Sequence, residues 1–177
     1  CLNIGGQEGM LIYNNTITTT GASPGWPIKL WNDGYLNGCK IYNNTLKRPP
    51  FPYQVNGTNN YFDFCIEMFH EQGLEIYNNT IEGSIDLNYQ TKGSYAYSAY
   101  IHDNIIGRST QAAHWESGII LEFGTENCTI ENNTFKSISH PIFFSLRPGD
   151  LITNITIQKN LAYNIGKTDG SKEGKAI

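Results

Sequence analysis

The heptapeptide LIYNNTI at residues 11–17 sets the pattern of this chain, because close copies return as KIYNNTL at 40–46 and as EIYNNTI at 75–81. Looser copies follow as YIHDNII at 100–106, TIENNTF at 129–135 and TIQKNLA at 156–162. Successive copies begin 25 to 35 residues apart. Self-similarity at such a period indicates a solenoid, in which each repeat forms one coil and its neighbours cover its apolar face.

Stacking the copies in register places like residues on top of one another. The apolar positions form one column of Ile12, Ile41, Ile76, Ile101, Ile130 and Ile157, and a second of Ile17, Leu46, Ile81, Ile106, Phe135 and Ala162. Small or turn-forming residues precede the copies at Gly9, Gly38, Gly73, Ser98, Asn127 and Asn154. Short apolar runs bounded by such residues predict strands.

An asparagine lies between the two apolar columns in every copy, at Asn15, Asn44, Asn79, Asn104, Asn133 and Asn160. Because an amide both donates and accepts hydrogen bonds, we predict an asparagine ladder that runs from coil to coil. The alternative is that the Asn-Asn-Thr triplets are N-glycosylation sites. The sixth copy keeps the asparagine in QKNLA but lacks the glycosylation signal, which favours the structural role.

Two of the four cysteines, Cys39 and Cys128, occupy an apolar column two residues before the repeat isoleucine. They are three repeats apart, which corresponds to ~14 Å at ~4.8 Å per strand. A disulfide cannot bridge that distance, so we expect free thiols packed as small core residues. The repeat pattern does not assign Cys1 or Cys65.

The bulk composition limits the classes of partner. A chain of 177 residues with 39% apolar residues is sufficient for one domain with a core, so we expect a single domain over residues 1–177. The net charge of −4 and the absence of a basic patch argue against a nucleic-acid partner. No apolar run approaches the roughly 18–20 residues of a membrane-spanning helix, so no membrane partner is expected.

The IYNNTI-type units over residues 9–165 resemble the repeat of the pectate-lyase-like superfamily. This resemblance implies an all-β fold, a right-handed parallel β-helix of about six coils, in a secreted or periplasmic bacterial protein. The right-handed crossover is also the one that parallel strands favour. Members of the superfamily carry a capping element, so we expect either a segment of a longer helix or ends covered by a further chain or a second copy.

A second set of short strands is predicted at 28–31, 66–69, 85–88, 121–124 and 142–145. Period-two alternation turns Ile28, Ile66, Ile85, Leu121 and Ile142 inward and aligns Lys29, Glu67, Asp86, Glu122 and Phe143 in one outward column. Three carboxylates on neighbouring strands repel one another, and this repulsion raises at least one pKa. Such a group on a rigid sheet is typical of a functional site. The alternative is a solvated acidic face with Lys29 as its counter-charge.

The surroundings of this column suit a sugar ligand. The next outward column reads Trp31, Phe69, Asn88, Gly124 and Ser145, so two aromatic rings that could stack on a sugar lie beside the carboxylates. Long loops at 47–63 and 107–118 lead into the strands of Glu67 and Glu122, and loops on a rigid scaffold usually carry specificity. We predict as substrate-binding residues Lys29, Trp31, Phe69, His70, Asn88, His114, Trp115 and Arg147.

Paired carboxylates in this setting predict a glycoside hydrolase that acts on a plant-type or bacterial polysaccharide or oligosaccharide. The resemblance agrees, because hydrolases of the superfamily carry acidic residues on the strands of one sheet face. We expect Glu67 and Glu122 to act as the acid and base. Asp86 lies between them as the nucleophile or as a modulator of their pKa, and no cofactor is expected.

Two alternatives stay open. A lyase of the same superfamily would use Ca²⁺, held by Glu67, Asp86 and Glu122, with Lys29 or Arg147 as the base. The acidic chain has little basic character with which to hold a polyanion, which disfavours this alternative. The other alternative is a non-catalytic carbohydrate-binding or structural β-helix.

Overall fold

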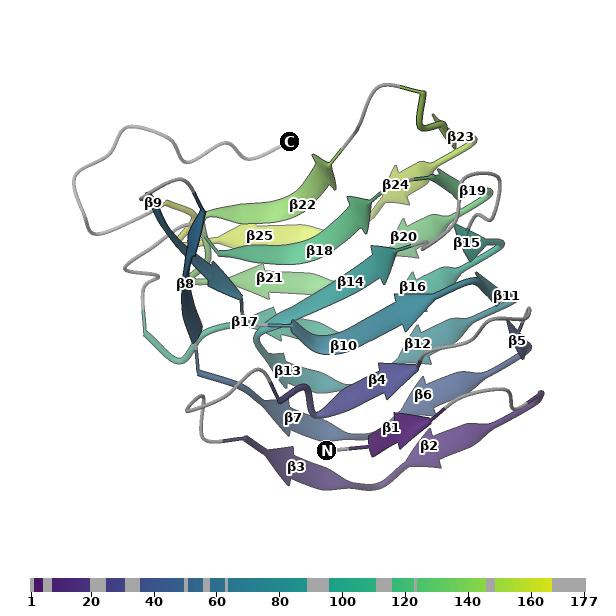
Figure 1. Cartoon of the computed structure of the whole chain (residues 1–177), viewed down its shortest axis with the longest axis horizontal. Coiled ribbons are helices and arrows are strands. Elements are labelled where there is room, and N and C mark those ends of the chain that lie inside the picture. The colour runs from purple at the N-terminus through teal and green to yellow at the C-terminus, as the bar shows by residue number, and fades with distance from the viewer. Residues whose placement is uncertain are drawn as a thin grey trace.

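The repeat copies stack as coils of parallel strands in the computed structural model of the chain (Figure 1). The structure describes residues 2–4, 8–19, 25–30, 36–49, 51–55, 58–62, 64–88, 96–110, 116–122, 124–145 and 149–166, and for 36–37, 51–55, 58–62 and 96–97 it describes the backbone path alone. All elements within these ranges are strands. Within each coil the chain runs in turn through four sheets, named A, D, B and C in that order, before it begins the next coil.

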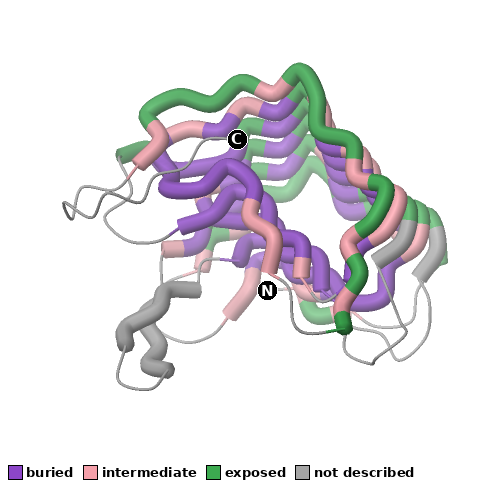
Figure 2. Tube along the Cα trace, turned by 90° about the horizontal axis from the view of Figure 1, so that it is seen from above, coloured by how far each residue is buried: buried purple, intermediate pink, exposed green. Residues whose placement is uncertain are grey.

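Six strands in each of sheets A, B and C give the solenoid its three faces, and Figure 2 shows the coils superimposed when they are viewed from above. Sheet A contains β1 (Leu2–Ile4), β4 (Ile28–Leu30), β10 (Phe64–Phe69), β14 (Ser84–Asn88), β18 (Ser117–Glu122) and β22 (His140–Ser145). Sheet B contains β2 (Leu11–Tyr13), β6 (Lys40–Tyr42), β12 (Glu75–Tyr77), β16 (Tyr100–His102), β20 (Thr129–Glu131) and β24 (Thr156–Gln158). Sheet C contains β3 (Thr16–Thr18), β7 (Thr45–Lys47), β13 (Thr80–Glu82), β17 (Ile105–Gly107), β21 (Thr134–Lys136) and β25 (Leu161–Tyr163).

Two smaller sheets complete the fold. Sheet D contains β5 (Leu36–Asn37), β11 (Glu71–Gln72), β15 (Ala96–Tyr97), β19 (Thr125–Glu126) and β23 (Ile152–Thr153). An antiparallel hairpin of β8 (Phe51–Val55) and β9 (Thr58–Phe62) lies inside the segment predicted as a long loop. The repeat pattern could not predict this hairpin, because residues 47–63 lie outside the repeated heptapeptide.

Each IYNNTI-type unit supplies one strand to sheet B and one to sheet C. The predicted isoleucine column is confirmed in sheet B, where the six residues are Cα partners from Ile12 to Ile157. The second apolar column is confirmed in sheet C from Ile17 to Ala162. Both columns point into the solenoid, where most of their members are buried in one continuous core.

The first asparagine of the Asn-Asn pair bends the chain between sheets B and C. It takes a left-handed conformation, with φ of 57° at Asn14, 55° at Asn43 and 54° at Asn78. Asparagine accepts this conformation more readily than most residues, which explains its choice at the bend. The predicted turn column from Gly9 to Asn154 also has positive φ throughout, so both corners of sheet B are made by left-handed residues.

The second asparagine forms the predicted ladder. Asn79 Oδ1 accepts hydrogen bonds from the backbone nitrogen of Asn44 (2.9 Å) and from its Nδ2 (3.0 Å). Asn79 Nδ2 donates to Ile41 O (2.9 Å) and to Asn104 Oδ1 (3.0 Å). The same pattern continues to Asn133 and Asn160. Each amide therefore satisfies buried backbone groups of its own corner and fixes the position of the adjacent coil.

Replacement of Asn79 by alanine should remove these bonds inside the stack. The buried N–H of Asn44 and carbonyl of Ile41 would lose their partners, so we expect a loss of about 2–4 kcal/mol in the free energy of unfolding. Asn15→Ala is the matched control, since Asn15 is exposed and water can replace its bonds. Urea unfolding of both variants measures the difference, and equal losses would contradict the ladder's role in stability.

The prediction that Cys39 and Cys128 pack as small core residues is confirmed. Cys39 is 1% exposed and Cys128 is not exposed at all, and neither forms a disulfide. Cys65, which the repeat pattern did not assign, is also buried and forms no disulfide, whereas Cys1 lies outside the described residues. Burial raises the pKa of the Cys128 thiol to about 12, so it remains an inert, protonated core residue.

The outer face of sheet B carries a stack of aromatic rings. The ring centroids of Tyr13 and Tyr42 are 5.0 Å apart, those of Tyr42 and Tyr77 are 4.9 Å apart, and those of Tyr77 and His102 are 5.1 Å apart. The interplanar angles are 5° or less, so the rings lie parallel. They occupy one in-register position of four successive strands, which is why their separation matches the strand spacing.

One carboxylic acid, Glu71, lies inside the solenoid. It is 1% exposed, and neither of its oxygens accepts a hydrogen bond of good geometry. Thr125, two strands along in the same sheet, is likewise not exposed. Burial raises the pKa of Glu71 from 4.5 to about 8, although the neighbouring Cys39 thiol acts in the opposite direction.

Glu71→Leu should therefore stabilise the protein in a pH-dependent way. Below pH 4.5 the carboxyl is protonated in both states, and between pH 4.5 and about 8 only the unfolded state releases its proton, so the wild type loses stability as the pH rises. We expect a gain on the order of 3 kcal/mol at pH 8 and a much smaller gain at pH 4. The control is Glu126→Leu, in the outward column of the same sheet. An equal gain at both pH values would contradict this account.

Candidate functional site

The outward face of sheet A holds the predicted charged column, but one of its members lies elsewhere. Lys29 and Glu67 are Cα partners, as are Glu67 and Asp86, which confirms this part of the column. The partner of Asp86 in β18 is Ile120, and the prediction that Glu122 lies directly beside Asp86 is wrong. The observed column continues from Ile120 to Phe143.

Glu122 is displaced by two residues along its strand. It is the Cα partner of Ser145 and lies beside Asn88, in the place where Gly124 was predicted. A shift of two residues keeps Leu121 buried and Glu122 outward, so the apolar alternation fixes the face of a strand without fixing its register. The sequence pattern fits either register equally well.

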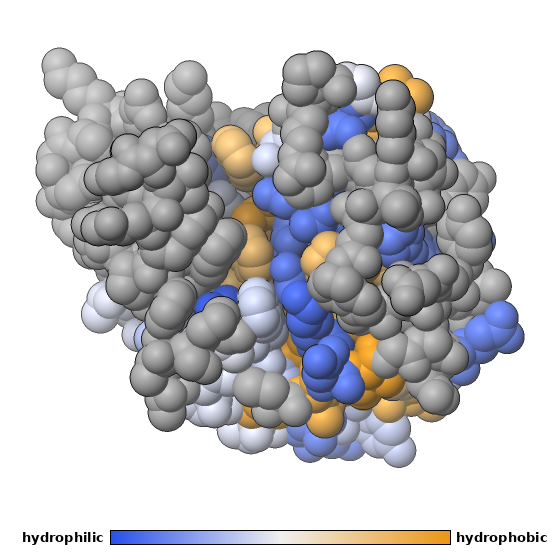
Figure 3. Space-filling view, in the orientation of Figure 1, coloured by the Kyte–Doolittle hydropathy of each residue, from blue (hydrophilic) through white to orange (hydrophobic). Residues whose placement is uncertain are grey.

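A hydrophilic strip crosses the front of the molecule over sheet A (Figure 3). The polar side chains on this face are nevertheless well buried, with exposed fractions of 6% for Glu67, 0% for Asp86 and 9% for Asn88. Ionisable groups at this depth are held away from water, so their protonation is set by their neighbours.

Glu67 forms an ion pair with Lys29, whose Nζ lies 2.7 Å from Glu67 Oε2. Burial raises the pKa of Glu67, while the hydrogen bond and charge of Lys29 and the charge of Arg48 act in the opposite direction. Lys29 is held in turn by two rings, since its Nζ lies 4.2 Å from the centroid of Trp26 and 5.1 Å from that of Phe69. Glu67 therefore sits in a cationic and aromatic environment.

Asp86 has a different environment. It is fully buried, and neither carboxyl oxygen accepts a hydrogen bond of good geometry. Burial raises the pKa of Asp86 well above its usual range, and the charges of Glu122 and Glu67 raise it further, whereas the Asn88 amide and the charge of Lys29 lower it. Asp86 is thus disposed to keep its proton.

Glu122 completes the group from the next strand. It is half-buried, and its Oε2 accepts a hydrogen bond of 3.2 Å from Asn88 Nδ2. From strand spacings of ~4.8 Å and rises of ~3.3 Å per residue, the Cα atoms of Asp86 and Glu122 are about 8 Å apart, and those of Glu67 and Asp86 about 5 Å apart. Glu67 and Glu122, the pair predicted as the acid and base, are about 12 Å apart by the same measure.

The other predicted binding residues divide into two groups. Phe69 and His70 lie at the end of β10, each 6% exposed, and His70 has a φ of 59°. Trp31, His114, Trp115 and Arg147 lie outside the described residues, so their predicted roles stay predictions.

Two neighbours of the site were not predicted from the sequence. Arg48 is fully buried, with its Cζ 5.3 Å from the ring centroid of Trp26. Arg48 directly follows β7, and Trp26 precedes β4, so neither belongs to a repeated column. The signal available in the sequence was that Arg48 follows the inward Leu46 by two residues, which predicts an inward side chain. A buried guanidinium needs partners, so such an arginine indicates a polar or aromatic neighbour.

The described part of the chain has no group of three or more His, Cys, Asp and Glu side chains placed to hold a metal ion. The described residues also include no helix long and apolar enough to cross a membrane.

Residues 1–168 match the family described as the right handed beta helix region. This chain belongs to the right-handed β-helix family. Neither a comparison with curated proteins nor one with solved structures gave a match. Membership confirms the predicted fold, and within this β-helix the carboxyl group of sheet A is the candidate functional site.

The environment of Asp86 predicts that this carboxyl reduces the stability of the β-helix. Its raised pKa means that the unfolded state alone releases the proton as the pH rises above 3.8, so the cost grows toward neutral pH. We expect the free energy of unfolding of Asp86→Asn to match that of the wild type at pH 3 and to exceed it at pH 7.

Asp103→Asn is the matched control, because Asp103 is exposed at a bend that asparagine occupies in other coils. Chemical unfolding at both pH values measures the effect. A pH-independent difference between Asp86→Asn and the wild type would contradict the raised pKa.

Proposed function

We propose that this β-helix is a glycoside hydrolase acting on polysaccharide or oligosaccharide, with Asp86 as the proton donor and Glu122 as the general base. The observation that carries the proposal is a fully buried carboxyl, neither oxygen of which accepts a hydrogen bond of good geometry, beside a half-buried carboxyl on the next strand. Glycoside hydrolysis needs two carboxyl groups in different environments, one of which keeps its proton as Asp86 is disposed to do.

In this proposal the proton of Asp86 passes to the glycosidic oxygen as the bond from that oxygen to the anomeric carbon breaks. Glu122 accepts a proton from a water molecule whose oxygen bonds to the anomeric carbon from the opposite side. Asn88 holds Glu122 through the 3.2 Å hydrogen bond from Asn88 Nδ2 to Glu122 Oε2. The Cα atoms of Asp86 and Glu122 are about 8 Å apart, so their carboxyl groups can take up the separation of roughly 6.5–9.5 Å that inverting enzymes use.

Glu67 is the other possible partner of Asp86, because their Cα atoms are about 5 Å apart on neighbouring strands and retaining enzymes hold their two carboxyl groups about 5–5.5 Å apart. Its ion pair with Lys29 and its burial favour a supporting role, because a neutralised carboxylate is a weaker nucleophile. We propose that the Lys29–Glu67 ion pair keeps this face of sheet A polar and forms hydrogen bonds with the sugar. The lyase alternative has less support, since Lys29 is engaged in this pair.

Activity measurements on a panel of plant and bacterial polysaccharides test the proposal. We expect Asp86→Asn and Glu122→Gln each to lower kcat/KM by about 10²–10⁴-fold, and Glu67→Gln to lower it less. Asp103→Asn serves as the control for the charge change. In the wild type, activity should fall as the pH rises through the raised pKa of Asp86, because the donor then loses its proton.

The products separate the candidate reactions. Release of reducing sugar with inverted anomeric configuration supports the assignment, and retained configuration would move the nucleophile role to Glu67. An unsaturated product detected by its absorbance would identify a lyase. Full activity in both Asp86→Asn and Glu122→Gln, or binding without turnover in the wild type, would overturn the proposal.

A further inference from the structure

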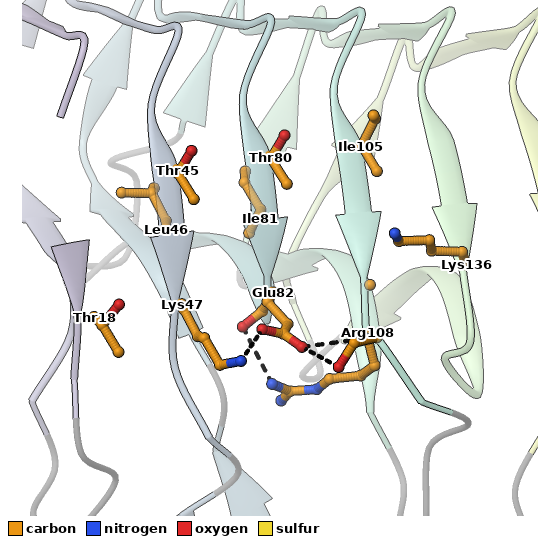
Figure 4. Close-up of a pocket in the computed structure, with 12 residues that line it drawn as sticks. Thr18, Thr45, Leu46, Lys47, Thr80, Ile81, Glu82, Ile105, Arg108 and Lys136 are labelled. Carbon is orange, nitrogen blue, oxygen red and sulfur yellow. Dashed lines mark hydrogen bonds and ion pairs between the residues drawn. The ribbon is translucent and has the colours of Figure 1, made fainter. Parts of the chain in front are cut away.

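Two carboxyl groups outside the candidate site, Glu82 and Glu71, lie in opposite environments. On the outer face of sheet C, Glu82 Oε2 lies 2.5 Å from Lys47 Nζ (Figure 4). Although partial burial acts to raise the pKa of Glu82, the hydrogen bonds from Lys47 and Ser109 lower it to about 2. Glu82 is therefore an ordinary ionised surface group, whereas Glu71 lies inside the solenoid and has no role in the proposed hydrolysis.

The surroundings of Glu71 give its ionised form nothing to bind. Glu71, Leu74 and the Cys39 side chain of the preceding coil are each 1% exposed. The inward side chain two strands along the same sheet is the neutral Thr125. Among the described residues, the Cys39 thiol is the one titratable group that acts on the pKa of Glu71, and no cation does. An ionised carboxylate in this place would therefore be costly.

The strand that carries Glu71 is held by few bonds. β11 is two residues long, and it lies between two left-handed residues, His70 with a φ of 59° and Gly73 with a φ of 63°. It pairs with β15 at one position, Gln72, whereas the preceding strand β10 pairs with β14 over most of its length. Short segments with few hydrogen bonds are the ones that open locally while the rest of a protein stays folded.

The corner beside β11 also has no side chains to tie one coil to the next. It is formed by Gly38 in the second coil and by Gly73 in the third, and the backbone bond there runs from Gly38 N to Gln72 O (2.9 Å). In the fifth and sixth coils the same corner holds Asn127 and Asn154, whose side-chain amides are hydrogen-bonded to each other. The second and third coils can therefore separate at this corner at lower cost than the fifth and sixth.

We propose that Glu71 is a proton-operated latch: when its carboxyl loses the proton, the sheet D corner of the second and third coils opens and exposes Cys39. Opening moves the carboxylate from the apolar core into water, which removes the cost of a buried charge. The asparagine ladder lies at the corner between sheets B and C, where Asn79 Oδ1 binds Asn44, so these two sheets stay joined.

The pH range of the latch follows from the raised pKa of Glu71, about 8 instead of 4.5, which burial causes. Below pH 4.5 the carboxyl is protonated in the closed and the open state alike. Between pH 4.5 and about 8 only the open state releases the proton, so the equilibrium constant for opening rises about tenfold per pH unit. Above about pH 8 both states are ionised, and the constant no longer changes.

The latch is connected to the candidate site through the chain itself. One residue, His70, separates β11 from β10, which carries Glu67 and ends at Phe69. The Phe69 ring centroid lies 5.1 Å from Lys29 Nζ, the cation that pairs with Glu67. Opening at β11 therefore releases the end of the strand that orders this group. An effect of the latch on turnover rests on the proposed function, whereas the latch itself does not.

Labelling of the cysteines with 4,4′-dithiodipyridine tests the latch. The labelling rate of the urea-unfolded chain, divided by that of the folded protein at the same pH, gives a protection factor for each thiol, and mass spectrometry assigns the label to each cysteine. At low reagent concentration the rate follows the population of the open form. We expect the protection factor of Cys39 to fall by about 10³-fold between pH 5 and pH 8 in the wild type.

Glu71→Gln removes the titrating group, so the protection factor of Cys39 should then follow the pH no more than that of Cys128 does. Glu71→Leu is the second variant, and it needs no hydrogen-bond partner in the core. Glu126→Gln is the matched control, because Glu126 lies in the outward column of the same sheet, and it should keep the wild-type fall. Cys128, three coils from Cys39, reports opening of the whole solenoid.

Each contrary result removes a stated part of the proposal. Equal falls at Cys39 and Cys128 in the wild type would overturn a local opening. A fall at Cys39 that persists in both Glu71→Gln and Glu71→Leu would overturn the role of Glu71. A protection factor of Cys39 that does not change with pH would overturn the latch entirely. None of these measurements needs turnover, so a failed latch leaves the proposed hydrolase untouched, and an inactive protein leaves the latch untouched.

Discussion

The hydrogen-bonded ladder of asparagine amides is the interaction on which this molecule depends. A parallel solenoid has corners where backbone groups leave one sheet and have not yet entered the next, and those groups are buried. The amides from Asn44 to Asn133, 1–2% exposed, satisfy them and at the same time tie each coil to its neighbours. One residue type thus solves a local hydrogen-bonding problem and sets the global register.

Because the ladder fixes sheets B and C so firmly, chemical variation concentrates on the other side of the coil. The interval between successive repeats varies where the chain returns from sheet C to sheet A, and there lie the β8–β9 hairpin and the ion pair of Arg108 with Glu116. The buried carboxyls of sheet A sit beside this variable region. The rigid, repetitive side of each coil therefore supports a variable side, in which ionisable groups are more deeply buried than on an ordinary protein surface.

The predictability of the structure follows the same division. The columns from Ile12 and Ile17, the ladder and the left-handed turns could be predicted because each rests on a residue type repeated in every coil. The register of β18 could not, since alternation with period two is satisfied equally by Ile120 or Glu122 opposite Asp86. Arg48, Trp26 and the hairpin occur once each, and a single occurrence gives a repeat-based argument nothing to compare.

The parallel rings of Tyr13, Tyr42 and Tyr77 give the β-helix an optical property of its own. Chromophores of one kind, held 4.9–5.0 Å apart with interplanar angles of 3–5°, couple their electronic transitions, whereas tyrosines in a disordered chain absorb independently. The near-ultraviolet circular dichroism of this protein therefore carries a signal from the first three coils in particular. Local separation of those coils can be followed by light, without a label, while the remainder of the solenoid stays folded.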